Sequence, residues 1–400
     1  MNKKAFVLFL AVLLIPMAAA EKNERYIANT NSFLDKLYFQ FSGCEIMHEL
    51  EDATAIKCPP GIASKFANVQ EDKILHIMDM DANMQINADD VWNLGYTGTG
   101  ITIAVLDTGI DTDHPELNAS IAGGMGFGYS TYEDDHGHGT HVSGIITANG
   151  VTPYAKGVAP NANVWMAKVC NAAGECYTSD MAAAIEYIVQ GPDGIANNGD
   201  EPADIMSISI GGGGTGGPNC NRDYLAQKVN WAVSNGATVV VAAGNSAGVV
   251  SSPACASGAI AVGAVDKNDV RAYFSGTGKS LDIMAPGVAI YSSVIGGYAS
   301  WSGTSMATPH VSATIALMKE KNSTMTDAQI KEALYNTAVD LGLSSRYQGN
   351  GRLDAYAAIT YTGETPPPPP NECKPHPVKC NCDGACTGNE NVKFCPWDCQ

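Results

Sequence analysis

Long apolar runs are nearly absent from this chain of 400 residues. The longest, Ala5 to Ala20, is shorter than the roughly 20 residues needed to span a bilayer, and no later segment is long and apolar enough to be transmembrane. It follows the basic start Met1-Asn2-Lys3-Lys4 and ends in small residues, which is typical of a secretory signal peptide rather than a membrane anchor. We therefore expect a signal peptide at residues 1–20 and a soluble, secreted mature protein.

Positive charge is also scarce, since 23 Lys and Arg residues stand against 41 Asp and Glu residues and give a formal net charge of −18. This balance argues against a nucleic-acid partner and favours solubility. The acidic residues are spread along the chain, so they point to no particular binding surface.

Cysteine, in contrast, is plentiful, with 12 residues in a chain that we expect to be exported. The cysteines fall into groups with an even number of members, which favours pairing within groups, although spacing alone does not fix the connectivity. The groups are Cys44 and Cys58; Cys170 and Cys176; Cys220 and Cys255; and six between Cys373 and Cys399.

Residues 21–80 form a first, small unit. The runs Cys44 to Leu50 and Ala53 to Cys58 are patterned as strands, and a third run, Ile74 to Asp79, precedes an irregular stretch. This unit is too small to be expected to stand alone.

Residues 81–360 show strand and helix patterns in alternation, which predicts an α/β fold with a doubly wound parallel sheet and helices on both faces. Ligand sites in such sheets form where strands end at their carboxyl side, and Asp107, Ser209 and Asn245 occupy such positions. The predicted strands are 101–107, 164–169, 205–210, 238–243 and 259–265, and the predicted helices are 139–148, 179–189, 222–235 and 326–338.

A proline-rich linker at 361–372 separates this domain from a Cys-rich tail at 373–400. The uninterrupted run Pro366 to Pro370 is a stiff, extended spacer. The tail is too short for an apolar core, and its six cysteines fit either a disulfide knot or a zinc site, of which the knot suits an exported chain.

A serine stands where a turn leads into an apolar helix, in the segment Gly303 to His310. Ser305 could simply cap the helix, but a hydroxyl at a helix N-terminus also has free backbone N–H groups beside it that stabilise an oxyanion. We expect Pro309 to lie in the first turn, where its missing N–H costs nothing.

Two upstream segments favour the catalytic interpretation. Asp107 follows a buried strand, where a carboxylate needs a donor, and His138 begins a helix in the run His136 to Gly144. Three histidines in that run suggest a metal site as an alternative, but no carboxylate follows at the spacing of zinc proteases. Asp107, His138 and Ser305 occur in that order, 31 (138 − 107) and 167 (305 − 138) residues apart, which is one of the known orders of a serine-protease triad.

Residues 85–358 resemble the subtilisin family of serine proteases, the subtilases, at four separate motifs: Asp107-Thr108-Gly109, His138 to His141, Ala242 to Asn245, and Gly303 to His310. The resemblance implies that Asp107 orients the imidazole, that His138 is the general base and then the general acid, and that Ser305 is the nucleophile. It also implies that Asn245 and the Ser305 amide stabilise the oxyanion.

The resemblance further implies a polypeptide substrate that binds as an added strand between two backbone edges. The matching edge residues are Ser209, Ile210, Gly211, Ala242, Ala243 and Gly244. Residues 246–252 carry no charge, so we expect a preference for apolar or uncharged side chains before the scissile bond. A catalytically inactive binding module and an esterase are the alternatives; the complete set of motifs argues against the first, and the lack of a Gly-x-Ser-x-Gly elbow argues against the second.

By position and pattern, residues 21–80 resemble a subtilase propeptide that assists folding and inhibits the enzyme until it is cleaved off within 73–85. The chemistry is expected to need no cofactor, and we expect a monomer. A structural calcium ion stays open, because Glu116 stands where the family usually has Asp, and Val151 stands where an amide ligand is expected. The oxygen-rich stretch Asp79 to Asp90 offers other calcium ligands.

Overall fold

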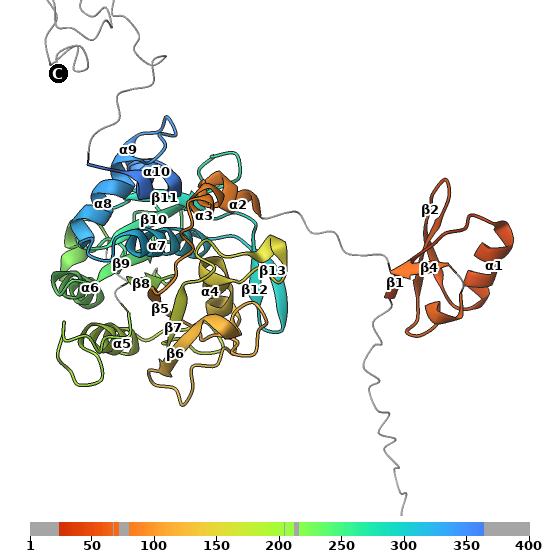
Figure 1. The fold of residues 1–400 in the computed structure, drawn as a ribbon, viewed down its shortest axis with the longest axis horizontal. Helices are drawn as coiled ribbons and strands as arrows, with labels where there is room; N and C mark the ends of the chain where they lie inside the picture. Colours follow the sequence, from red (N-terminus) through yellow and green to blue (C-terminus); the bar gives the residue numbers. More distant parts are fainter. Residues whose placement is uncertain (1–23, 67, 72–79, 204, 212–215, 364–400) are drawn as a thin grey trace, which may run out of the picture. The chain divides into compact units, whose positions relative to one another are not determined.

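The computed structural model describes residues 24–363 except 67, 72–79, 204 and 212–215 (Figure 1). The predicted signal peptide, the Cys-rich tail and the third predicted strand of the first unit lie outside the described residues. The chain divides into two compact units, Met1–Ile77 and Met78–Gln400.

The first unit is a four-stranded antiparallel sheet with one helix, α1 (Phe33–Phe41), and a short 3-10 turn (Ala63–Lys65). Its strands lie in the order β2-β3-β1-β4 and are β1 (Glu24–Ala28), β2 (Glu45–Glu49), β3 (Thr54–Cys58) and β4 (Val69–Glu71). Phe39 and Ile56 fill its small core beside the Cys44–Cys58 disulfide. The two sequence-predicted strands correspond to β2 and β3, whereas β1 and α1 were not predicted.

The second unit is built on a seven-stranded sheet in which every neighbouring pair is parallel, in the order β11-β10-β9-β8-β5-β7-β6. The strands are β5 (Thr102–Asp107), β6 (Ile121–Gly126), β7 (Asn163–Lys168), β8 (Ile205–Ile208), β9 (Thr238–Ala242), β10 (Ile260–Val265) and β11 (Ile283–Pro286). Strands β6 and β7 lie on one side of β5, and the later strands β8 to β11 lie on the other, so the strand order reverses at β5. Asp107, the last residue of β5, therefore lies at the position where α/β sheets bind ligands.

Helices cover both faces of this sheet, as predicted (Figure 1). Ile103 and Val105 of β5 join one apolar core, which includes α4 (His138–Thr147) and α7 (Thr304–Lys321). Ala104 and Leu106 join a second core with α5 (Thr178–Gln190) and α6 (Tyr224–Ser234). Alternate side chains of one strand thus point into two cores, which explains the continuous apolar runs in the sequence.

Helix α7 is buried along nearly its whole length and carries Pro309 in its interior rather than in its first turn. The expectation for Pro309 was wrong, because the helix already begins at Thr304. A proline inside a helix cannot donate to the carbonyl four residues earlier, which is that of Ser305.

The remaining elements complete the second unit. The hairpin of β12 (Ile290–Val294) and β13 (Gly297–Trp301) precedes α7, and α8 (Asp327–Asn336) begins with a capping box formed by Thr326 and Gln329. The short helices are α2 (Met80–Gln85), α3 (Ala88–Asn93), α9 (Ser345–Gln348) and α10 (Ala355–Thr360), and the 3-10 turns are Asn118–Ser120, Pro153–Ala155 and Gly217–Arg222.

Among the described residues, three disulfides pair the first three groups as predicted: Cys44–Cys58, Cys170–Cys176 and Cys220–Cys255. The fourth group, in the tail, lies outside the described residues. Among the helices of the described residues, none combines the length and apolar character that crossing a membrane requires.

Candidate active site

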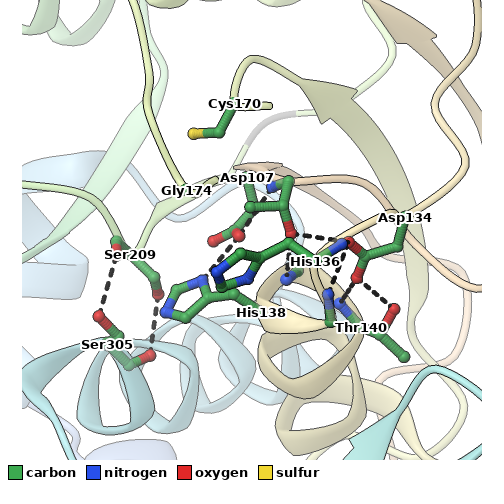
Figure 2. Close-up of polar contacts among 12 residues, drawn as sticks. Asp107, Asp134, His136, His138, Thr140, Cys170, Gly174, Ser209 and Ser305 are labelled. Carbon is green, nitrogen blue, oxygen red and sulfur yellow. Dashed lines mark hydrogen bonds and ion pairs between the residues drawn. The ribbon is translucent and has the colours of Figure 1, made fainter. Parts of the chain in front are cut away.

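Asp107 and His138 form the centre of the site. Asp107 is fully buried at the end of β5, and its Oδ1 lies 2.7 Å from Nδ1 of His138, the first residue of α4 (Figure 2). The same oxygen accepts a hydrogen bond from the Thr108 amide at 2.8 Å. Because Nδ1 faces a carboxylate, it carries the proton, which leaves Nε2 of His138 as the basic nitrogen.

The surroundings of His138 shift its pKa in opposite directions. Burial lowers the pKa of His138, but the charge and hydrogen bond of Asp107 and the charge of Asp134 raise it, and the net result is a pKa above the ordinary 6.5. A partly buried imidazole, 22% exposed, that still gains a proton readily suits general base catalysis near neutral or mildly alkaline pH.

The other two histidines near this helix do not share that role. Burial lowers the pKa of His141 to about 3, so its ring is neutral, and its Nε2 donates to the backbone oxygens of Ile290 and Ala299. The exposed His136 lines the cleft beside His138. Within the described part of the chain no group of three or more His, Cys, Asp or Glu side chains could hold a metal ion.

Ser305 is the second residue of α7, and its side chain faces the end of β8. Its Oγ donates to the backbone oxygen of Ser209 at 3.0 Å, and Oγ of Ser209 donates back to the backbone oxygen of Ser305 at 2.9 Å (Figure 2). The second bond satisfies the carbonyl that Pro309 leaves without a helical partner.

Asn245 follows β9 and is held by Thr304. Its Oδ1 accepts hydrogen bonds from the amide of Thr304 at 2.8 Å and from Oγ1 of Thr304 at 2.9 Å, and Oγ1 of Thr304 also accepts from the Gly244 amide at 3.1 Å. With its oxygen engaged in this way, the Asn245 side chain retains its NH₂ group as a donor. Thr304 was not singled out from the sequence, because a threonine at the start of a helix is typical of any helix.

All predicted catalytic side chains line one cleft of about 400 Å³. Five of the six predicted edge residues line it as well: Ser209, Ile210, Gly211, Ala242 and Gly244. The sixth, Ala243, lines an adjoining pocket of about 440 Å³ together with Gly244 and Asn245. The disulfide Cys170–Cys176 and Gly174 within its loop form another wall of the cleft.

Glu116, the candidate for the open calcium site, is fully buried, and its carboxylate already accepts four hydrogen bonds. It accepts the amides of Gly150, Val151 and Thr152 at 2.8, 3.0 and 2.6 Å, and the hydroxyl of Tyr298 at 3.0 Å. Calcium requires several oxygen ligands, whereas this loop presents N–H donors to the carboxylate. The residues around Glu116 therefore do not fit a calcium ion.

Sequence analysis missed Asp134, a buried carboxylate four residues before His138. It accepts five hydrogen bonds. It stands between two other acidic residues, Glu133 and Asp135, and its place two residues before the run His136 to Gly144 is the signal that could have drawn attention to it.

The chain is similar to known proteases. Residues 98–351 match the model of the subtilase family. The chain is 41% identical over 315 residues to an alkaline protease of Alkalihalobacillus alcalophilus, covering 77% of each chain. It is 44% identical over 278 residues to subtilisin Savinase of Lederbergia lenta (68% of this chain, 96% of the relative) and 35% identical over 369 residues to subtilisin E of Bacillus subtilis (89% and 91%).

Proposed function

This chain belongs to the subtilase family and is a subtilisin-like serine endopeptidase, and on that premise we propose that Asp107, His138 and Ser305 are its catalytic triad. The observation that carries the proposal is the 2.7 Å contact between Asp107 and His138 in a cleft that Ser305 also lines. In the reaction, Nε2 of His138 takes the proton of Ser305 Oγ as that oxygen attacks the peptide carbonyl. The histidine then gives this proton to the leaving amine, and water hydrolyses the acyl-enzyme.

Oxyanion stabilisation falls to the NH₂ group of Asn245 and to the backbone amide of Ser305. The bonds from Thr304 to Asn245 support this role, because they fix the amide plane before substrate arrives. A preorganised donor needs no reorientation when charge develops. Loss of one such donor lowers kcat by about 10²–10³-fold, a magnitude known from subtilisin itself.

Specificity for uncharged side chains before the scissile bond follows from the adjoining pocket. The pocket of about 440 Å³ is large enough for a bulky side chain, and its walls carry no charge. It is lined by Gly216, Gly217, Ala243, Gly244, Asn245, Ser246, Gly248, Val249 and Ser251. In this proposal the main chain of the substrate pairs with Ser209 to Gly211 on one side and Ala242 to Gly244 on the other.

Synthesis as a secreted proenzyme completes the proposal. The signal-like residues 1–20 support export, and the separate compact unit of the first 77 residues supports a propeptide. The enzyme cleaves itself within 73–85, works as a monomer and needs no cofactor for its chemistry.

Replacement of the nucleophile tests the triad and the processing together. Ser305→Ala should lower kcat toward peptide substrates by about 10⁶-fold, the magnitude known for subtilisin, and should accumulate as a precursor that has lost only residues 1–20. Full processing of the variant to the mature size would contradict self-cleavage, and undiminished peptidase activity would contradict the assignment of Ser305. Ser302→Ala, at the residue directly after β13, is a matched control that should keep both properties.

A further inference from the structure

Asp134 has the most saturated carboxylate around the catalytic histidine, yet it does not belong to the triad. The residue as a whole is 7% exposed. One oxygen, Oδ1, accepts from Oγ1 of Thr108 at 2.9 Å, from the His136 amide at 3.0 Å and from the Gly137 amide at 2.9 Å (Figure 2).

The second oxygen of Asp134 holds the first turn of α4. Oδ2 accepts from the amide of Thr140 at 3.0 Å and from its Oγ1 at 2.6 Å. The Asp134 carboxylate therefore accepts hydrogen bonds from backbone amides on both sides of His138.

Thr108 extends this link to the residue next to Asp107. Its Oγ1 donates to Asp134 and accepts from the Gly139 amide at 2.9 Å. Asp107 and His138 are thus joined by their own 2.7 Å contact and by a second, parallel connection through Thr108 and Asp134.

The position of the carboxylate also matters electrostatically. The N-cap residue of α4 is Gly137, which has no side chain to cap the helix, and an imidazolium at a helix N-terminus meets the positive end of the helix dipole. Asp134 supplies both the missing acceptor and a compensating negative charge. The amide bonds from Gly137, Thr140 and His136 outweigh burial and hold the pKa of Asp134 below its ordinary value of 3.8, so the group is ionised at neutral pH.

The other charged groups nearby have partners of their own. Lys168 of β7, which is 2% exposed, forms an ion pair with Asp135 at 2.6 Å and also donates to the Thr108 carbonyl. The Glu133 carboxylate accepts hydrogen bonds from Oγ1 and the amide of Thr112. Among the described residues, Asp107, His136 and His141 are further titratable groups beside His138, and the ring of His141 is neutral because burial lowers its pKa to about 3.

We propose that Asp134 is a positioning residue for the catalytic histidine, holding the start of α4 against the Asp107 segment and favouring the imidazolium that forms during catalysis. The inference rests on the proposed triad. It requires Asp134 to be ionised throughout the pH range in which His138 titrates.

The test compares Asp134→Asn with Glu116→Gln. Glu116 is a matched control, because it is also a buried carboxylate that accepts several backbone amides, but it holds the loop that follows the other end of α4. Asp134→Asn should lower kcat about tenfold with little change in KM, and should move the acid limb of the kcat/KM profile to lower pH. Glu116→Gln should lower stability and leave the acid limb in place.

A direct titration separates this inference from the proposed function. The pKa of His138 can be followed by NMR of its Nδ1 proton in the Ser305→Ala protein with and without Asp134→Asn, and that measurement needs no catalysis. A lower pKa of His138 in the double variant supports the inference. An unchanged pKa of His138, together with a kcat/KM profile of Asp134→Asn that superimposes on that of the wild type, overturns it. If Asp134→Asn does not fold, carbon NMR of the Asp134 carboxyl in the Ser305→Ala protein decides, since protonation of that carboxyl above pH 6 would contradict the proposal.

Discussion

Ser209 and Ser305 are joined by two hydrogen bonds that run in opposite directions, each from one hydroxyl to the other residue's backbone oxygen. The bond from Oγ of Ser209 to the backbone oxygen of Ser305 is needed because of Pro309, which removes the helical N–H that would otherwise reach this oxygen. The residue that follows β8 thus holds the first turn of α7 in place.

Ser209→Ala should therefore lower kcat strongly while it lowers the free energy of unfolding only modestly. The Ser305 carbonyl would lose its donor, and we expect a fall in kcat of about tenfold together with a loss of about 1 kcal/mol in the free energy of unfolding. Steady-state kinetics and denaturant unfolding measure the two quantities.

Ser207→Ala is the control for that experiment. Ser207 lies two residues earlier in the same chain segment, and its Oγ accepts from Oγ of Ser312, also in α7, at 2.9 Å. The control loses a similar buried bond without touching the nucleophile, so its kcat should stay near that of the wild type. Equal kcat values for the two serine variants would refute the positioning role of Ser209.

The pH dependence of activity should follow His138. The base must be neutral to accept a proton, so kcat/KM should rise as the pH increases through a raised pKa, above 6.5. Asp107→Asn removes the largest interaction that raises the pKa of His138, so burial should then lower that pKa. The same substitution should lower kcat by about 10⁴-fold. A wild-type acid limb that lies below pH 6.5 would contradict the electrostatic description of the site.

The loop held by Glu116 should be insensitive to calcium. A chelator in excess should leave the hydrogen exchange of the Gly150, Val151 and Thr152 amides unchanged, because their acceptor is a carboxylate of the protein. Glu116→Gln should speed exchange at these amides and lower the free energy of unfolding by about 1–3 kcal/mol. Faster exchange in the wild-type protein on chelation would show that a cation does hold this loop.

The pocket beside Asn245 should respond to an introduced charge. Ser246 is exposed at its wall, and Ser246→Glu should raise kcat/KM for lysine relative to phenylalanine before the scissile bond by about tenfold. Ser246→Lys should change the ratio in the opposite direction. Cleavage of a mixed peptide library by the wild-type enzyme sets the baseline, and a strong preference for charged residues there would refute the proposed specificity.

Much of the sheet could be predicted, because β5, β7, β8, β9 and β10 are short apolar runs bounded by polar or glycine residues. Strand β6 was missed because glycine occupies half of Ile121–Gly126, and the β12–β13 hairpin was missed because its residues are mixed in polarity. Asp107 and His138 were placed together correctly through family motifs.

The supporting residues could not be predicted in the same way. The roles of Ser209 and Asp134 depend on how α7 meets β8 and how α4 begins beside β5, and both are contacts between segments far apart in the sequence. Glu116 was only a candidate calcium ligand, named from its position in the family motif. Its partners are three amides and the Tyr298 hydroxyl, whose directions only the folded loop determines.

Helix α7 has one more consequence, which concerns synthesis of the chain. Asp107 and His138 emerge from the ribosome well before Ser305, and α7 fills the core beneath β8, β9, β10 and β11 only after all of these strands exist. With the proposed triad, a nascent chain therefore has a base and its orienting carboxylate but no nucleophile. The cell that makes this protease carries no active fragment of it until translation has passed Ser305.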